Sequence, residues 1–350
     1  MAPAPTARAE SLITEPAEPS AHSGESLLTD PDPFPAHGPL PDGCKIFTGN
    51  AHPQLARNIA ARLGMELGDA TVSHFEDGEV QVRINENIRG LDVFVVQPTH
   101  PPAEHLIELL VMLDAARRAS VRRVTAVVPY FGYARQDRKD QPRVPITAKL
   151  VANLIVKAGA DRVLTMDLHA QQIQGFFDIP LDHLVALPVL VDYFKKREVT
   201  ELSICTADVG GIKGAWKFAE RLNAPLAIVD KKRSGDTQVE ALVLIGEVKG
   251  RNIVIPDDMI ATGGTLVQAA SFLRKHGAKD LYAACTHALL SGDAVERLKD
   301  AGFTEVVHTN TVPIDDAKRE PNYVELSIAK LFGEAILRIH KETSVSSLFE

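Results

Sequence analysis

The chain has little cysteine, few aromatic residues and no long apolar run. Its three cysteines, Cys44, Cys205 and Cys285, are far apart in the 350 residues and form no Cys-x-x-Cys pair. A disulfide framework or a zinc site is therefore not expected, and the pattern is typical of a protein in a reducing cytoplasm. No stretch approaches the roughly 18 apolar residues of a membrane-spanning helix, so no membrane partner is expected either.

A basic excess is also missing, which disfavours a general nucleic-acid binder. The formal charge is −8, and residues 1–42 supply most of it, with seven acids against one base. The same segment has nine of the 22 prolines and little apolar periodicity. We interpret 1–42 as a disordered, acidic, proline-rich tail with no catalytic role. It has neither the apolar block of a secretory signal nor the arginines of a mitochondrial presequence.

From Gly43 onward, short β-branched runs alternate with helical patterns. The expected strands are 44–47, 93–96, 124–128, 162–166, 202–205, 226–229, 252–255 and 305–308. The expected helices are 53–63, 103–119, 146–157, 210–222, 265–276 and 323–340. This alternation predicts the α/β class with mostly parallel sheets flanked by helices. Because the region is long for one open sheet, we expect two α/β domains, 43–188 and 189–350.

Four polar or glycine-rich segments follow expected strands at the positions where parallel sheets bind ligands. These segments are 130–138, 167–170, 208–211 and 257–265. Parallel α/β sheets bind ligands beyond the carboxyl ends of their strands. We therefore expect the four segments to form one functional face.

The segment Asp-Asp-Met-Ile-Ala-Thr-Gly-Gly-Thr at 257–265 is the most informative. Its glycines allow a phosphate to approach the backbone, and the N-terminus of the following helix offers free N–H groups. The carboxylates of Asp257 and Asp258 suit the vicinal hydroxyls of a sugar or a hydrated magnesium ion. A lone Thr-Gly-Gly-Thr is more often a turn with Thr265 as helix cap, but the preceding acids favour a sugar-phosphate site.

Three other groups of residues are ambiguous when each is taken alone. Arg135 and Gln136 suit a phosphate and a base edge, although such a pair is more often a solvated loop. His169, after an expected strand, would more often be a packing residue. The Lys-Lys-Arg run at 231–233 would more often be a basic surface turn.

Longer strings resolve this ambiguity, because they resemble one family of enzymes. The 257–265 segment resembles the signature shared by type I phosphoribosyltransferases and ribose-phosphate pyrophosphokinases. Residues 75–79, 84–90, 129–138, 167–177 and 344–349 resemble the second family. The likeness extends from about residue 43 to the C-terminus.

The resemblance implies two phosphoribosyltransferase-like domains that transfer the β,γ-diphosphoryl group of ATP to the C1 hydroxyl of ribose 5-phosphate for nucleotide biosynthesis. It also implies Mg²⁺ as cofactor and a homo-oligomer, often a hexamer. The residues it assigns to ATP are Phe75, Asp77, Gly78, Glu79, Arg135 and Gln136. Those assigned to ribose 5-phosphate are Asp257, Asp258, Ala261, Thr262, Gly263, Gly264 and Thr265. His169 and Asp208 are implied as metal ligands, and Lys231 and Arg233 as catalytic residues on a loop that closes over ATP.

The chain departs from the family pattern at a few positions. Ala261 stands where the family commonly has an acid, and Gly214 and Trp216 stand where many relatives have arginines. These departures favour one alternative, a non-catalytic regulatory relative that assembles with active subunits. A second alternative, an ordinary phosphoribosyltransferase with a hood over its base, does not account for the ATP-like segments in the first half of the chain.

Overall fold

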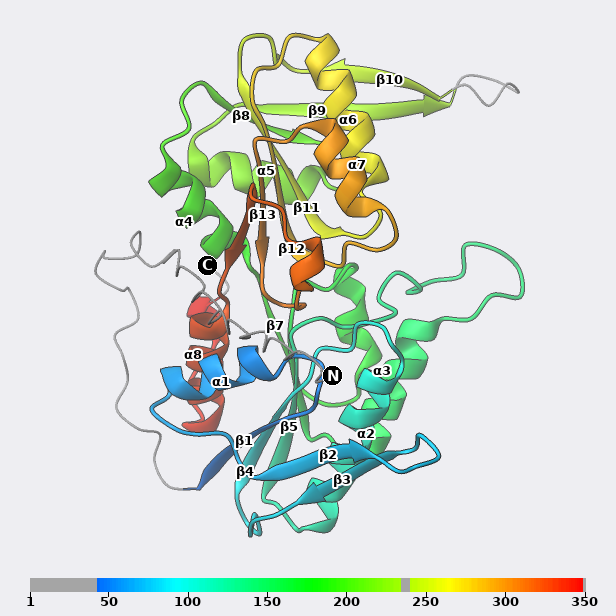
Figure 1. The fold of residues 1–350 in the computed structure, drawn as a ribbon, viewed down its shortest axis with the longest axis vertical. Coiled ribbons are helices and arrows are strands. Elements are labelled where there is room, and N and C mark those ends of the chain that lie inside the picture. The colour runs from blue at the N-terminus through cyan, green and yellow to red at the C-terminus, as the bar shows by residue number, and fades with distance from the viewer. Residues whose placement is uncertain (1–42, 234–239, 349–350) are drawn as a thin grey trace, which may run out of the picture. The chain divides into compact units, whose positions relative to one another are not determined.

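A computed structural model describes residues 43–348 except 234–239, and side chains except those of 231–241 (Figure 1). The predicted tail 1–42 lies outside the described residues. Within the described range, no helix is long and apolar enough to cross a membrane.

The first sheet has five parallel strands in the order β1-β4-β5-β6-β7. They are β1 (Cys44–Thr48), β4 (Asp92–Val96), β5 (Arg123–Val128), β6 (Arg162–Met166) and β7 (Leu181–Leu184). The helices α1 (Pro53–Arg62), α2 (Glu104–Arg118) and α3 (Thr147–Ala158) connect them, together with the 3₁₀ turn η1 (Gln171–Phe176). Helices α2 and α3 pack on the same face, where apolar residues of the strands form a buried core (Figure 1).

The second sheet has seven strands in the order β10-β9-β8-β11-β12-β13-β14. They are β8 (Leu202–Thr206), β9 (Leu226–Arg233), β10 (Glu240–Ile245), β11 (Asn252–Ile260), β12 (Leu281–Ala288), β13 (Glu305–Thr309) and β14 (Tyr323–Leu326). All neighbours are parallel except the edge pair β9 and β10. Helices α4 (Leu187–Arg197) and α5 (Ile212–Leu222) lie on one face, and α6 (Gly264–Lys275) and α7 (Ala294–Ala301) on the other (Figure 1). The predicted class, α/β with mostly parallel sheets flanked by helices, is confirmed.

The remaining elements are an antiparallel hairpin, a C-terminal helix and two short turns. The hairpin consists of β2 (Ala70–His74) and β3 (Val80–Ile84). The helix is α8 (Ala329–His340), and the 3₁₀ turns are η2 (Asp316–Lys318) and η3 (Ser346–Leu348). Although α8 follows the last strand of the second sheet, it packs against α1 of the first. The predicted division of the chain at 188/189 stays a prediction.

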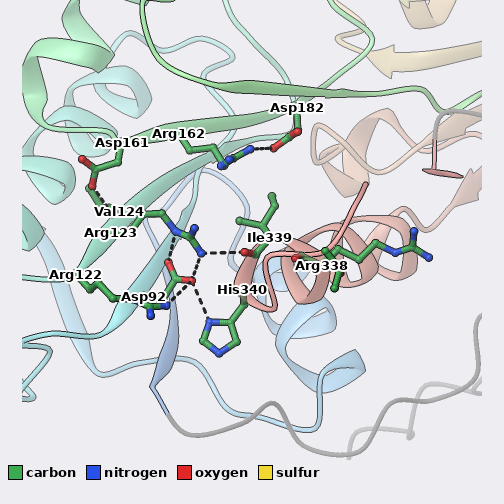
Figure 2. A network of polar contacts seen from close by, with 11 residues as sticks. Asp92, Arg122, Arg123, Val124, Asp161, Arg162, Asp182, Arg338, Ile339 and His340 are labelled. Carbon is green, nitrogen blue, oxygen red and sulfur yellow. Dashed lines mark hydrogen bonds and ion pairs between the residues drawn. The ribbon is translucent and has the colours of Figure 1, made fainter. Parts of the chain in front are cut away.

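A buried ion-pair network, which we call the Asp92 network, fastens α8 to the first sheet (Figure 2). Asp92 accepts hydrogen bonds from Arg123, with its Oδ1 3.0 Å from Nε and its Oδ2 2.5 Å from Nη2. Arg123 Nη2 also donates to the Ile339 carbonyl of α8 at 2.9 Å, and His340 Nδ1 lies 3.0 Å from Asp92 Oδ2. Asp92 is fully buried, so its charge requires these partners.

One predicted helix was partly wrong, and several elements were not predicted. The pattern at 323–340 predicted a continuous helix, but Tyr323–Leu326 is a strand that pairs with β13. The helix begins after Ile328, whose N–H donates to Asn310 Oδ1 at 3.0 Å. Strands β2, β3, β7, β10, β12 and β14 and helices α4 and α7 had no predicted counterpart. In β12 the reason is its alanine-rich sequence, which has low strand propensity but is buried along its whole length.

Candidate active site

The carboxyl ends of the strands in both sheets bring two predicted segments into contact. His169 follows β6 of the first sheet, and Asp258 lies on β11 of the second. The Nδ1 of His169 is 2.6 Å from Oδ2 of Asp258, although the residues are 89 apart in the sequence. Asp257 and Asp258 were predicted to follow their strand, but they lie within β11, because β12 continues to pair with it as far as Ile260. The contact joins the two halves of the predicted functional face.

The site shifts the pKa values of His169, Asp257 and Asp258 in different directions. The hydrogen bond that His169 donates to Asp258 raises the pKa of His169. Burial acts to raise the pKa of Asp258, but the hydrogen bonds from His169 and Asp257 outweigh it and lower that pKa. Burial and the negative charge of Asp258 raise the pKa of Asp257. Asp258 is therefore the more acidic carboxyl of the adjacent pair.

Asp208 lies at the same edge of the second sheet, after β8. Its backbone is held by Thr206 Oγ1, which donates to the Asp208 carbonyl at 2.7 Å, and Gly211 N–H donates to Asp208 Oδ1 at 2.8 Å. The charge of Asp208 helps to raise the pKa of Asp257, so the two carboxylates are within electrostatic reach. The predicted metal ligand Asp208 and the predicted sugar ligand Asp257 thus belong to one acidic edge.

Residues 261–263 form a short loop between β11 and α6. The loop is held by Ser291, whose N–H donates to the Ala261 carbonyl at 2.8 Å. Gly263 has a left-handed φ of 71° and precedes the first residue of α6. Within the described residues, the N–H groups of Thr262 and Gly263 make no hydrogen bond, and those of the first helical turn have no partner in the helix. The loop can therefore bind an anion through its backbone.

Arg135 and Gln136 border a cavity that His169 also lines. The cavity has a volume of about 280 Å³, and its lining is Arg135, Gln136, Asp137, Arg138, Asp140, Val144, Pro145 and His169. Gly132 brings this loop against the first sheet, because its N–H donates to Thr99 Oγ1 at 2.8 Å. A Cβ at Gly132 would lie 2.1 Å from the Thr99 carbonyl oxygen, so only glycine fits. The structure thus brings Arg135, Gln136 and His169 together.

Similar proteins identify the family to which this arrangement belongs. The model of the N-terminal domain of ribose phosphate pyrophosphokinase matches residues 44–159, and that of the phosphoribosyl synthetase-associated domain matches 236–350. The ribose-phosphate pyrophosphokinase of a Nostoc species is 53% identical over 307 residues, which are 87% of this chain and 93% of that protein. The one from Bacillus caldolyticus is 50% identical over 87% of this chain and 98% of its own length. The chain belongs to the ribose-phosphate pyrophosphokinase family.

A solved structure supports the same assignment for the fold. The crystal structure of phosphoribosylpyrophosphate synthetase from Mycobacterium smegmatis matches with a TM-score of 0.81 and 41% identity. The match covers 86% of this chain and 99% of that one. The predicted resemblance to ribose-phosphate pyrophosphokinases is confirmed, and so is the predicted fold with two phosphoribosyltransferase-like domains.

The remaining ATP residues predicted from the family lie at another place in the chain. Asp77, Gly78 and Glu79 form the turn of the β2–β3 hairpin, beside the half-exposed Phe75. Gly78 and Glu79 line a second cavity of about 400 Å³, together with the start of α2. This cavity shares no lining residue with the one at Arg135. The structure of this chain does not bring the hairpin turn to the His169 site.

Lys231 and Arg233 were predicted on a loop, and that placement was wrong. Their backbones belong to β9, opposite Leu242 and Glu240 of β10. The strand is longer than predicted because β10 supplies a hydrogen-bonding partner that the sequence pattern did not reveal. The side chains of both residues lie outside the described part of the structure, as do residues 234–239. Their catalytic role stays a prediction.

The departures from the family pattern lie where the fold tolerates them. Ala261 binds Ser291 through its carbonyl, which any residue supplies. A Cβ at Gly214 would meet no atom within 4 Å, so glycine is not required there by packing. Trp216 is 52% exposed on α5. The fold explains neither Gly214 nor Trp216.

The sequence did not identify three residues that support the site. Asp167 lies in the predicted 167–170 segment but had no predicted role, and Thr286 and His287 of β12 lie outside every predicted segment. Thr286 Oγ1 donates to Asp167 Oδ2 at 2.6 Å, and His287 Nε2 lies 3.1 Å from the Asp167 carbonyl oxygen. The available signal was the sequence Cys-Thr-His-Ala at 285–288, which ends an unrecognised strand at the functional edge.

Proposed function

We propose that this protein transfers the β,γ-diphosphoryl group of ATP to the C1 hydroxyl of ribose 5-phosphate. The products are 5-phosphoribosyl 1-diphosphate and AMP. The observation that carries the proposal is the contact of His169 with Asp258. It places the cavity lined by Arg135 and Gln136 next to the acidic strand that leads into the 261–263 loop.

Each half of the site has the chemistry that one substrate needs. The guanidinium of Arg135 suits a nucleotide phosphate, and Gln136 suits a base or ribose edge. Phe75, Asp77, Gly78 and Glu79 are proposed to hold ATP as well, although in this chain Gly78 and Glu79 line a cavity that is separate from the one at Arg135.

The sugar-phosphate side combines backbone donors with carboxylates. The loop from Ala261 to Thr265 would hold the 5-phosphate through its N–H groups at the start of α6. Asp257 and Asp258 would accept hydrogen bonds from the ribose hydroxyls. Their position on a paired strand fixes them more firmly than a free loop would.

Mg²⁺ is the proposed cofactor, with His169 and Asp208 as its protein ligands. Among the described residues, no three histidine, cysteine or acidic side chains cluster as a metal cage. A set of one or two protein ligands fits Mg²⁺, which keeps several waters and binds phosphate oxygens. One carboxylate oxygen of Asp208 accepts from Gly211, and the other accepts no hydrogen bond from the residues that the structure describes. When bound, the ion would neutralise phosphate charge.

The chemical step asks the protein mainly for positioning. The sugar O1 forms a bond to the β-phosphorus, the bond from that phosphorus to the oxygen bridging the α-phosphate breaks, and AMP leaves with the bridging oxygen. The hydroxyl proton passes to solvent. Lys231 and Arg233 are proposed to stabilise the charge that develops on the transferred group. In-line geometry then requires both half-sites to be held at a fixed distance.

The assembly and location are also proposals. The protein is proposed to act in the cytoplasm as a homo-oligomer, by likeness a hexamer. Its cysteines support a reducing compartment, since Cys44, Cys205 and Cys285 are free and buried.

The test is a coupled assay for AMP with the purified chain, ATP and Mg²⁺, with and without ribose 5-phosphate. We expect AMP release that depends on the sugar, together with a product whose mass is that of phosphoribosyl diphosphate. A folded protein that binds ATP but releases no AMP would instead be a non-catalytic regulatory relative. AMP formation without sugar would indicate simple hydrolysis and contradict the proposal.

A further inference from the structure

The two residues that precede His169 are fixed by hydrogen bonds from several elements. Asp167 N–H donates to the Leu184 carbonyl at 3.0 Å, and Asp167 Oδ2 accepts from Ala186 N–H at 3.0 Å. The Leu168 N–H donates to His183 Nε2 at 2.8 Å. These bonds hold the end of β6 to β7 and the segment after it, within the first half of the chain.

Two further bonds come from β12 of the second sheet. Thr286 Oγ1 donates to Asp167 Oδ2 at 2.6 Å. His287 Nε2 lies 3.1 Å from the Asp167 carbonyl oxygen, which can only accept, so this nitrogen carries the proton. The other nitrogen, Nδ1, lies 2.9 Å from Thr311 Oγ1. Burial lowers the pKa of His287, in agreement with a neutral ring that has this tautomer.

These bonds hold Asp167 in a conformation that it would not adopt alone. Its φ is 37°, in the left-handed region. This region is unfavourable for a residue with a Cβ atom, and the surrounding bonds offset that cost. The turn at Asp167 directs the chain from the end of β6 to His169, so the position of His169 depends on it.

The register of the second sheet connects Thr286 to the acidic strand. On β11 and β12, Asp257 pairs with Cys285 and Met259 pairs with His287. Thr286 is therefore the residue of β12 level with Asp258. Two links thus join the segment after β6 to adjacent strands of the second sheet: Asp167 with Thr286 of β12, and His169 with Asp258 of β11. Asp167 and Thr286 are 119 residues apart in the sequence, and the Thr286 side chain is buried.

We propose that Thr286 is a positioning residue for diphosphoryl transfer, acting through Asp167. Its hydroxyl holds the end of β6 against β12, and so sets the distance between the nucleotide side and the sugar-phosphate side. This inference rests on the proposed function. Because Thr286 is buried and lines neither cavity, we expect its loss to affect the alignment of the two bound substrates more than the binding of either.

The test compares three substitutions in the full-length protein. Thr286→Val keeps the shape of the side chain and removes the hydroxyl, whereas Thr286→Ser keeps the hydroxyl. Thr125→Val is the matched control: Thr125 is fully buried on β5, and its hydroxyl has no partner in the described structure. For each, kcat and both KM values are measured, along with the separate Kd values for ATP and ribose 5-phosphate and the melting temperature.

We expect kcat of Thr286→Val to fall by roughly 10- to 100-fold, the effect of a small misalignment of reacting groups. Both Kd values should stay within about twofold, and Thr286→Ser and Thr125→Val should keep most of the wild-type kcat.

Three results would overturn the proposal while the wild type remains active. They are an unchanged kcat in Thr286→Val, an equal loss in Thr286→Ser, or a loss that appears only as weaker binding of one substrate. If the wild type itself forms no AMP with ribose 5-phosphate, the proposed function fails instead, and the two failures are distinguishable.

Discussion

At the scale of single residues, the site depends on side chains whose partners come from the other sheet. His169 can reach Asp258 only because the backbone at Asp167 is turned and held there. A raised pKa at His169 and a lowered one at Asp258 show that each residue stabilises the charge of the other. The pair is therefore both an electrostatic contact and a fixed point between the two halves of the site.

Lys231 and Arg233 give the first prediction at this scale. We expect Lys231→Ala and Arg233→Ala each to lower kcat by about 100-fold or more, because a donor that stabilises transition-state charge is lost. The measurement is steady-state AMP formation. Lys249→Ala, at the turn before β11, is the control for loss of a lysine elsewhere. Near-normal turnover in both catalytic-site variants would show that the assignment is wrong.

His100 gives a second prediction, which concerns stability and pH. Burial, together with the neighbouring His105 and His52, lowers the pKa of His100 to about 3. Its value in the unfolded chain is about 6.5. Between about pH 3 and pH 6.5 the unfolded state binds one more proton at this position than the folded state does. The stability that the neutral His100 allows is therefore complete above about pH 6.5 and is lost as the pH falls through this window. The slope for this group is about 1.4 kcal/mol per pH unit.

We expect His100→Leu to flatten the pH dependence of unfolding by about that slope between pH 6 and pH 4. The measurement is urea unfolding at several pH values. At pH 8 position 100 is neutral in both the wild type and the variant, so the difference in their free energies of unfolding at that pH reports packing alone. If the variant and the wild type lose stability in parallel as the pH falls, His100 is not responsible.

At the scale of elements, the important feature is the junction of β11 with α6. The strand fixes Asp257 and Asp258, and the helix provides the N-terminus, with the 261–263 loop between them. Gly263 makes the turn with a left-handed φ of 71°. The loop is also bound from outside, because Ser291 N–H donates to the Ala261 carbonyl and Leu289 N–H donates to that of Ile260, the last residue of β11. It is therefore preformed rather than shaped by a ligand.

We expect Gly263→Ala to cost roughly 1 kcal/mol of stability, the typical penalty of a non-glycine residue in this region. It should also raise KM for ribose 5-phosphate several-fold, since the N–H groups shift. Gly250→Ala is the matched control, with φ of 75° and open space around its Cβ. It should cost similar stability, measured by thermal unfolding, with no change in KM. Equal KM values in the two variants would contradict a phosphate-binding role for the loop.

At the scale of the whole described chain, the second half of the chain contacts the first sheet at opposite ends of its strands. The active-site contacts lie at the carboxyl ends. The Asp92 network lies at the amino ends, since Asp92 and Arg123 begin β4 and β5 (Figure 2). There the returning helix α8 is bound through Ile339 and His340. The first connection serves alignment, and the second serves stability.

Asp92→Asn tests this division of roles. It keeps the shape of the side chain but leaves the Arg123 charge without its carboxylate, so we expect a loss of about 3 kcal/mol, typical of a broken buried ion pair. The kcat of the folded protein should be unchanged, because the network is far along the strands from the site. Asp114→Asn removes the exposed pair with Arg118 and should change the melting temperature little. A large loss of kcat at full folding would show that the network also acts on the site.

Local sequence determined the α/β class, most buried strands of the two sheets and the segments that carry the site. Short β-branched runs between amphipathic stretches are local signals, and residues 162–166 were predicted with the bounds of β6. The strings at 129–138, 167–177 and 257–265 also identified the family before any contact was known. The predicted roles of individual site residues remain predictions.

Tertiary structure alone decided which segments meet. Asp92 and His340 are 248 residues apart, and Asp167 and Thr286 are 119 apart, so no local propensity could pair them. The strand at Tyr323–Leu326 likewise exists because β13 offers an edge, whereas its sequence fitted a helix. The physical reason is the same in each case: hydrogen bonds across a sheet and compensation of buried charge depend on the partner that the fold supplies.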